Sequence, residues 1–184
     1  MKRSLKLLLC LGLLSAFAVF FAGCGTDIEE PDAEPQSYVG SGFALEYPGT
    51  WIYTQPADYI VLFSGAEGTE AYDATVNVQT LEMGEFYTDL DSVYNDFREQ
   101  FEGVGGTISE MTARDFQQNG ETFDAIEFYA EYEDVVVFNQ FLVVVDRGDG
   151  YLHQISYTAP ENIYDTYESI AMEIIASFEL RDVF

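Results

Sequence analysis

Cys24 is the residue of this chain whose surroundings define its chemistry most closely. It closes a segment with a basic start, an apolar run and two small residues: Lys2, Arg3 and Lys6, then Leu7 to Phe21, then Ala22 and Gly23. An apolar run too short to span a bilayer comfortably, between basic and small residues, is typical of a cleaved export signal rather than of a transmembrane helix. The segment therefore predicts export, with cleavage next to a thiol.

Phe21-Ala22-Gly23-Cys24 resembles the lipobox of bacterial lipoproteins, although Phe21 stands where Leu or Val is usual. The resemblance implies diacylglyceryl transfer to the Cys24 sulfur, cleavage after Gly23, and palmitate-type acyl chains on the mature N-terminus. Because two acyl chains give a stable anchor where one does not, we expect a protein held on the extracytoplasmic face of the cell membrane. The alternative is an ordinary signal peptide with an incidental cysteine.

Catalytic side chains are scarce in the rest of the chain. Cys10 leaves with the signal and Cys24 carries the lipid, so no free thiol remains for a disulfide or a cysteine nucleophile. The single histidine excludes a zinc site that needs two histidines. Ser41 lacks the Gly-x-Ser-x-Gly spacing of a nucleophile elbow. His153 lies on the same predicted strand face as Tyr151, which favours a hydrogen-bonded histidine within the sheet over a general base. We expect a protein that is not an enzyme.

Two pairs of aspartates supply oxygen ligands of the kind that calcium prefers. Asp89-x-Asp91 and Asp146-x-x-Asp149 both lack the spacing of an EF-hand loop, so they predict weak calcium association at most. Helix capping and turn formation explain the same aspartates without a metal. We expect no other cofactor.

The acidic balance limits the possible partners. The chain has 33 Asp and Glu and a formal net charge of −26, and after signal removal its only basic side chains are Arg98, Arg114, Arg147 and Arg181. Such a surface repels nucleic acid and anionic headgroups, whereas it suits a basic partner, divalent cations or a salty medium. The simpler explanation is that the acid keeps an exported domain soluble.

Three regions follow from these patterns: a signal peptide over residues 1–23, a lipidated acidic tether over 24–41, and a single domain over 42–184. The tether carries two prolines and no apolar periodicity. In the domain, alternating residues predict strands at 43–47, 59–63, 74–79, 108–116, 126–133, 135–145 and 151–157. The strand over 135–145 is apolar on both faces, which places it centrally in its sheet.

Two helices must cover this sheet. Apolar residues three and four apart from Leu90 to Phe101 predict a helix that begins near Thr88 and stops at Gly103. A second helix opens with Thr158-Ala159-Pro160-Glu161, for which we predict a capping box between Thr158 and Glu161. Its inward residues are expected to be Ile163, Tyr167, Ile170, Ile174 and Phe178.

Phe43-x-Leu45-x-Tyr47-Pro48-x-x-Trp51, followed by this order of strands and helices and by Ile174-Ile175-Ala176-Ser177-Phe178, resembles the PsbP-like fold. That fold is shared by the photosystem II protein PsbP, a Ran-binding nuclear import factor and DcrB-type bacterial lipoproteins. The resemblance implies an α+β, αβα sandwich with a mostly antiparallel sheet, which serves binding or assembly and has no common catalytic residues.

Three functions remain open at this point. The first is an anchored, non-enzymatic binding or assembly module that engages an envelope protein. The second is a receptor for a ligand or a divalent cation, which would use the aspartates or an aromatic platform that includes Trp51, Tyr53 and Tyr59. The third is an envelope hydrolase with a carboxylate pair. Oligomeric state and host do not follow from the sequence.

Overall fold

The fold is described from a computed structural model over residues 34–57, 60–84 and 87–181. The signal segment, Gly23, Cys24 and the tether up to residue 33 lie outside these ranges, and so does Tyr59. The predictions of cleavage and lipid attachment therefore stay predictions.

Eleven strands, two α-helices and one 3₁₀-helix make up the described residues. In chain order they are β1 (Gln36–Gly40), β2 (Phe43–Tyr47), β3 (Trp51–Ala57), β4 (Ile60–Gly65), η1 (Glu70–Asp73), β5 (Thr75–Glu82), α2 (Leu90–Gly103), β6 (Thr107–Ile108), β7 (Thr112–Gln118), β8 (Glu121–Glu133), β9 (Val137–Asp146), β10 (Tyr151–Pro160), α3 (Glu161–Ala176) and β11 (Glu179–Leu180).

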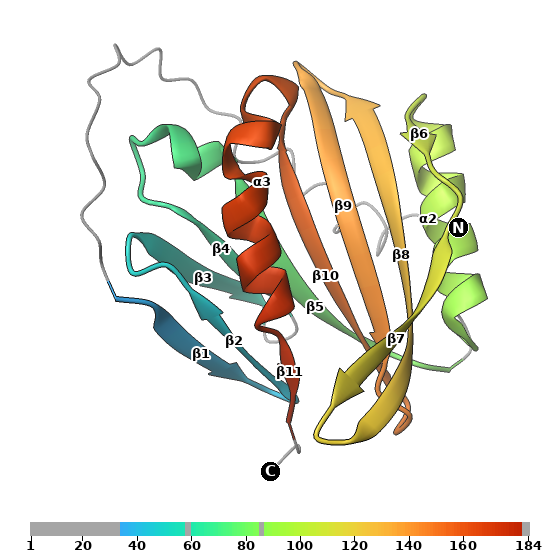
Figure 1. Ribbon diagram of the computed structural model, residues 1–184. Coiled ribbons are helices and arrows are strands. Elements are labelled where there is room, and N and C mark those ends of the chain that lie inside the picture. The colour runs from blue at the N-terminus through green and yellow to red at the C-terminus, as the bar shows by residue number, and fades with distance from the viewer. Residues whose placement is uncertain (1–33, 58–59, 85–86, 182–184) are drawn as a thin grey trace.

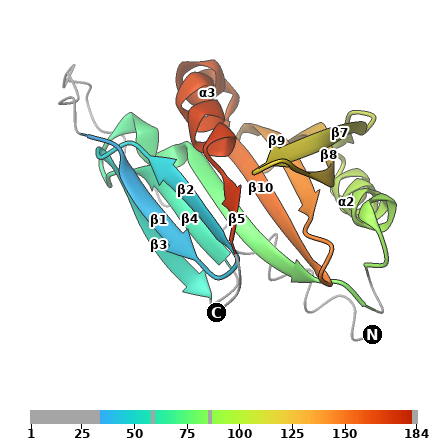
Figure 2. The same ribbon diagram turned by 60° about the horizontal axis from the view of Figure 1, so that its bottom comes forward.

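Eight of the strands form one antiparallel sheet in the order β3-β4-β5-β10-β9-β8-β6, with β7 paired to β8 beside this path. A smaller sheet, β1-β2-β11, lies with α3 over one face, and α2 covers β8 and β6 on the other (Figure 1; Figure 2). The architecture is α+β with a mostly antiparallel sheet between helices, as predicted. Two apolar clusters fill the two interfaces.

Strand alternation explains why both faces of the sheet are covered. On β9, Phe141, Val143 and Val145 belong to the cluster under α3, whereas Leu142 and Val144 belong to the cluster under α2. This confirms a central strand, but it begins at Val137 rather than at residue 135. Val135 and Val136 lie exposed in the preceding turn.

The first helix, α2, matches its prediction closely. It runs from Leu90 to Gly103, and its predicted apolar stripe packs in the cluster under it. Its N-cap is Asp89, whose side chain accepts a hydrogen bond from the Ser92 N–H at 2.7 Å, while the Ser92 hydroxyl accepts one from the Asp89 N–H at 3.2 Å. The capping box of this protein is therefore on α2.

The predicted capping box on the second helix is wrong. Thr158 lies within β10, where it pairs with Gln140 of β9 and Thr75 of β5, and the N-cap of α3 is Pro160, without a side-chain cap bond. Because β10 stays paired with β9 up to Pro160, Thr158 is held in the sheet and cannot turn back to cap the N-terminus of α3. Of the inward residues predicted for this helix, Ile163 and Ile174 are buried, Tyr167 and Ile170 are partly buried against the same cluster, and Phe178 is buried just after α3 ends.

Other strands also differ from the prediction: β3 (Trp51–Ala57) was not expected, and β8 begins at Glu121 rather than at residue 126. Residues 36–40, assigned to the tether, form β1 and pair with β2, so the folded part begins before residue 42. The strand predicted over residues 108–116 is two strands, β6 and β7, both paired with β8.

The last described residues join the two sheets. β11 pairs with β2, the Arg181 N–H donates to the Gly42 carbonyl at 2.9 Å, and the Gln118 side chain on β7 bonds both the N–H and the carbonyl of Leu180, at 2.6 and 2.7 Å. Across the ranges described above, no helix is long and apolar enough to cross a membrane.

Candidate functional site

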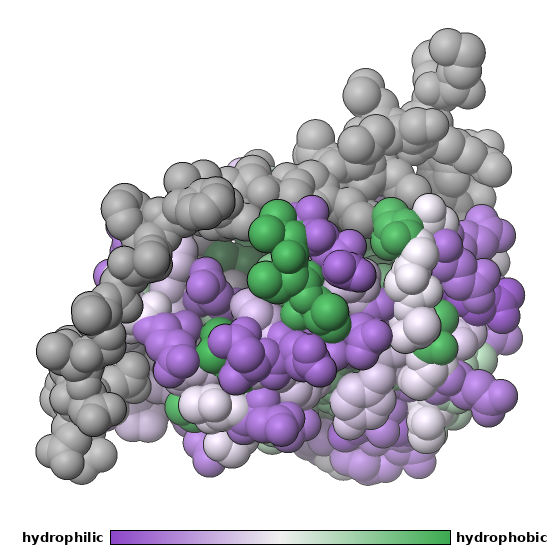
Figure 3. All heavy atoms as spheres, turned by 90° about the horizontal axis from the view of Figure 1, so that it is seen from above, coloured by the Kyte–Doolittle hydropathy of each residue, from purple (hydrophilic) through white to green (hydrophobic). Residues whose placement is uncertain are grey.

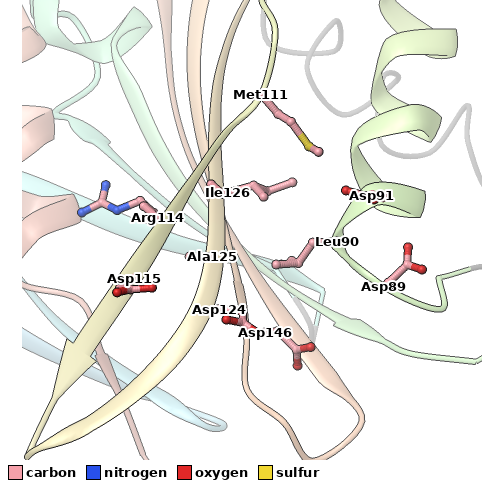
Figure 4. A pocket seen from close by; sticks show the side chains of 11 residues that line it. Asp89, Leu90, Asp91, Met111, Arg114, Asp115, Asp124, Ala125, Ile126 and Asp146 are labelled. Atoms are coloured by element: carbon pink, nitrogen blue, oxygen red, sulfur yellow. The ribbon is translucent and has the colours of Figure 1, made fainter.

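An open cleft of about 570 Å³ lies between the start of α2, the first half of β7, the first part of β8 and the end of β9 (Figure 4). Five aspartates line it, and we call it the aspartate cleft: Asp89, Asp91, Asp115, Asp124 and Asp146. Leu90, Met111 and Ile126 form its apolar floor. Three of the five aspartates were candidates from the sequence.

Strand register brings three of these aspartates into one row. Asp115 of β7 stands directly opposite Asp124 of β8, and the β8–β9 register, which pairs Ala125 with Val145, brings Asp124 beside Asp146. Directly opposed residues project to the same face of a sheet. The row therefore presents three carboxylates to the side on which α2 begins.

Asp89 and Asp91 enter the cleft from the first turn of α2 (Figure 4). The Asp89 carboxylate is engaged in capping the helix, where the partial positive charge of the N-terminus favours it. Asp91 is exposed in the same turn. Helix capping therefore explains Asp89 without a metal ion, which is the simpler of the two interpretations given above.

The only basic side chain at the cleft turns away from it. Arg114 sits on β7 next to Asp115, but its guanidinium points to the other side of the strand in Figure 4 and bonds the Glu127 carboxylate at 2.8 Å. The five aspartates are consequently left without a cationic partner among the residues that line the cleft.

Asp149 does not join Asp146 in the cleft. Its carboxylate pairs with the Arg147 guanidinium at 3.1 Å, and the Asp146 side chain accepts a hydrogen bond from the Gly148 N–H at 2.7 Å, which shapes the turn between β9 and β10. In the part of the chain that the structure describes, no three His, Cys, Asp or Glu side chains converge closely enough to hold a metal ion.

His153 is buried under the small sheet, on the same strand face as Ile155 and Tyr157. Its Nδ1 shares a hydrogen bond of 3.2 Å with the Thr80 hydroxyl, and its ring lies 5.7 Å, centroid to centroid, from that of Phe43. Burial and then the Arg147 charge lower the pKa of His153 to about 4, against a weaker opposing effect of Asp149. The side chain is therefore neutral near pH 7, without the solvent access that a general base needs.

The aromatic platform suggested by the sequence does not form around Trp51. This side chain is only 2% exposed and belongs to the cluster under α3, at the start of β3. Tyr53 is half-exposed, and its ring packs against Tyr38 at 5.0 Å and Tyr47 at 6.2 Å. These residues pack one another, which is the structural role that large aromatics usually have.

Sequence reasoning missed Asp115 and Asp124, although a signal for them was present. Asn119 and Gly120 both have positive φ, 53° and 82°, and form the two-residue turn between β7 and β8. Asn-Gly is the strongest short hairpin signal. Counting outward from that turn places residue 115 opposite residue 124.

No family model matches the chain, and no curated protein matches it. Among solved structures, the cyanobacterial PsbP protein from Synechocystis is 18% identical with a TM-score of 0.57, covering 87% of this chain and 99% of that one. LpqN of Mycobacterium tuberculosis, described as involved in cell envelope biogenesis, is 16% identical with a TM-score of 0.56 over 81% of this chain and 92% of its own.

The Ran-binding protein Mog1 of Saccharomyces cerevisiae is 13% identical with a TM-score of 0.51, over 82% of this chain and 97% of its own. At these identities the likeness shows the fold alone. The PsbP-like fold expected from the sequence is thereby confirmed.

Proposed function

We propose that this protein is a membrane-anchored lipoprotein of the cell envelope whose PsbP-like domain is a non-enzymatic module that binds or assembles an envelope protein. The anchor is the diacylglyceryl-modified Cys24, and the domain faces the extracytoplasmic side. The export segment before Cys24 supports this, and so does the fold shared with LpqN. The sole histidine is buried, which favours binding over catalysis.

The aspartate cleft is the observation that carries the choice of partner. Five carboxylates surround one hollow, and the adjacent arginine bonds Glu127 instead of them. Such a cleft attracts a basic surface, accelerates its approach and weakens with salt. The partner we propose is an envelope protein that presents Arg or Lys side chains to this cleft.

Proximity labelling from the intact lipoprotein in its native membrane tests the proposal, with a Cys24→Ala chain, which cannot be lipidated, as the control. We expect one envelope complex to be enriched reproducibly by the native chain and lost in the control. Labelling of bulk neighbours alone, equal in both chains, would contradict the assembly role.

The cleft itself is tested by the double change Asp115→Asn and Asp124→Asn. The matched control is Asp165→Asn, an exposed aspartate on α3 outside the cleft. Because each removed charge weakens attraction to a basic surface, we expect partner affinity to fall about tenfold for the double variant at low salt and little for the control. Unchanged affinity from low to high salt would contradict a charge-driven complex.

A divalent cation is the second candidate occupant of the cleft, because carboxylates are the oxygen ligands that calcium prefers, although no three of the described ones converge closely enough to hold an ion as they stand. A bound ion stabilises the folded state by mass action. Calcium titration followed by thermal unfolding separates the two functions. No change of melting temperature at millimolar calcium argues against a cation receptor and leaves the protein partner as the proposal.

A further inference from the structure

The two-residue turn between β7 and β8 places a side-chain amide directly before a glycine. Asn119 and Gly120 form this turn, both are exposed, and both have positive φ, 53° and 82°. The sequence holds five asparagines, and Asn119 alone among them precedes a glycine. Neither residue lines the aspartate cleft. The turn therefore carries chemistry of its own, separate from the site described above.

An asparagine followed by glycine can react with its own backbone. The Gly120 nitrogen attacks Cγ of Asn119, and a C–N bond closes a five-membered succinimide ring. The proton of the Gly120 N–H passes to the leaving amide nitrogen, which departs as ammonia. Water then opens the ring at either of its two carbonyls and leaves aspartate or isoaspartate. A following glycine hinders the attack least, because it has no Cβ.

The structure leaves both reacting groups free. Among the described residues, neither the Asn119 side chain nor the Gly120 N–H has a hydrogen-bond partner. Apart from the neighbours of Gly120 in the chain, no described atom lies within 4 Å of the place where a side chain at this position would begin. The amide and the nitrogen are thus open to each other and to water.

The fold slows this reaction without preventing it. The β7–β8 ladder reaches Gln118 and Glu121, and between them it holds the Asn119 backbone in the left-handed region. Closing the ring rotates the backbone bond next to the Gly120 nitrogen, so the turn must first open. Exposed turn tips open locally at little free energy. We therefore expect the folded chain to react more slowly than the unfolded chain, but to react.

Gln118, the residue before the turn, connects it to the end of the domain. Its side chain accepts a hydrogen bond from the Leu180 N–H at 2.6 Å and donates one to the Leu180 carbonyl at 2.7 Å. Isoaspartate carries its Cβ in the main chain, so the turn becomes longer, whereas aspartate keeps the original length. Because the length of a hairpin loop fixes the register of its strands, a longer turn displaces Gln118 from Leu180.

We propose that Asn119 is a site of spontaneous deamidation and that isoaspartate formed there releases Leu180 from Gln118. The reaction needs water and no enzyme. It adds one negative charge and loosens the junction between the large and small sheets as the protein ages. This goes beyond the function proposed above, because it depends neither on a partner nor on the aspartate cleft.

Peptide mass spectrometry of the aged full chain tests the modification. The chain is purified from its membrane in mild detergent and kept at pH 8 for several weeks, with a second sample in urea. We expect a gain of about one dalton at Asn119. Asn162, which is exposed on α3 and precedes Ile163, should react about tenfold less. No gain at Asn119 in the folded chain by the time the urea sample has fully reacted would overturn the proposal.

Two variants separate backbone length from charge. Asn119→Gly tolerates positive φ and has no amide, so the chain should keep its turn and gain no mass at this position. Asn119→Asp adds the same charge without lengthening the backbone. Hydrogen exchange of the Leu180 N–H should be about tenfold faster in the aged isoaspartate chain than in the fresh chain, and unchanged in Asn119→Asp.

The exchange measurement has two outcomes that contradict the release of Leu180. Equal acceleration in Asn119→Asp would assign the effect to charge instead of backbone length. Unchanged exchange in the aged chain, with isoaspartate present at position 119, would show that Gln118 keeps its bonds to Leu180 despite the longer turn. Neither outcome affects the function assigned to the aspartate cleft.

Discussion

On the α3 face of the large sheet, the polar side chains His153, Tyr157 and Tyr164 lie buried under a helix and a second sheet, whereas the aspartate cleft on the α2 face leaves its carboxylates at an open rim. The buried groups must each find a partner or remain unpaired at a cost. The rim carboxylates find water at little cost. The cleft carboxylates therefore cost the folded state little without a partner, whereas an unpaired buried hydroxyl costs it free energy.

Figure 3 shows the molecule from above, at the end of the sheet rather than on either of its faces. The surface seen in this view is mostly hydrophilic, and its hydrophobic residues gather in small patches rather than in one broad area. A broad apolar patch would mark a docking surface driven by burial. The described residues visible in this view form no such broad patch.

The largest expected difference between the two faces concerns pH and His153. Its pKa is about 4 in the folded state and about 6.5 when unfolded, so between these values the unfolded state binds more protons. The free energy of unfolding should therefore fall as the pH drops from 6.5 to 4, by about 3 kcal/mol from this residue.

Urea denaturation at pH 7 and pH 4.5 measures the effect, and His153→Gln is the control, because it removes the titration and can still reach Thr80. The free energy of unfolding should fall less in the variant as the pH is lowered. An equal decline of the free energy of unfolding in both proteins would mean that carboxylates, and not His153, cause the acid sensitivity. That outcome would contradict the contrast between the two faces.

The next effect compares two buried hydroxyls on the α3 face. Tyr157→Phe removes the bond to the Tyr164 carbonyl and should cost about 1–1.5 kcal/mol. Tyr164→Phe removes a hydroxyl that has no partner and should be neutral or slightly stabilising. Chemical denaturation of both variants checks this. A large loss for Tyr164→Phe would mean that the hydroxyl is already satisfied within the folded chain.

A third prediction concerns the two aspartates of α2. Asp89→Ala removes the N-cap acceptor and should destabilise the protein by about 1 kcal/mol. Asp91→Ala, exposed in the same turn, should change the free energy of unfolding by less than about 0.5 kcal/mol. Equal effects in urea denaturation would show that charge in the first turn matters more than the capping bond.

The smallest expected effect is a gain in stability from the row of opposed carboxylates. Since like charges directly opposite each other on a sheet repel, Asp124→Asn should stabilise the protein by about 0.2–1 kcal/mol at low salt. Molar salt should abolish most of that gain by screening. Thermal unfolding at two salt concentrations measures it, with Asp165→Asn for comparison. A gain that persists in high salt would rule out repulsion as its cause.

Periodicity predicted most of this fold because it reports which residues must be buried. The apolar stripe from Leu90 to Phe101 and the two apolar faces of β9 each led to the correct element and layer. Thr158 shows the limit of local signals. Its spacing to Glu161 is that of a capping box, but the backbone of Thr158 is held between two neighbouring strands, and this long-range pairing prevails.

The candidate sites were only partly predictable. Asp89, Asp91 and Asp146 could be named from the sequence, but their meeting with Asp115 and Asp124 depends on the register of β7, β8 and β9. Nothing local to Tyr164 indicates that its buried hydroxyl lacks a hydrogen-bond partner.

The pairing of β11 with β2 also sets when the domain can finish folding. The residues that close the small sheet, 177–181, follow every other described element, and the Ser177 hydroxyl accepts a hydrogen bond from the Glu46 N–H at 2.8 Å, 131 positions earlier in the chain. Contacts so distant in sequence form late, because their loop must close first. During synthesis, the small sheet therefore cannot be completed until residues 177–181 have emerged.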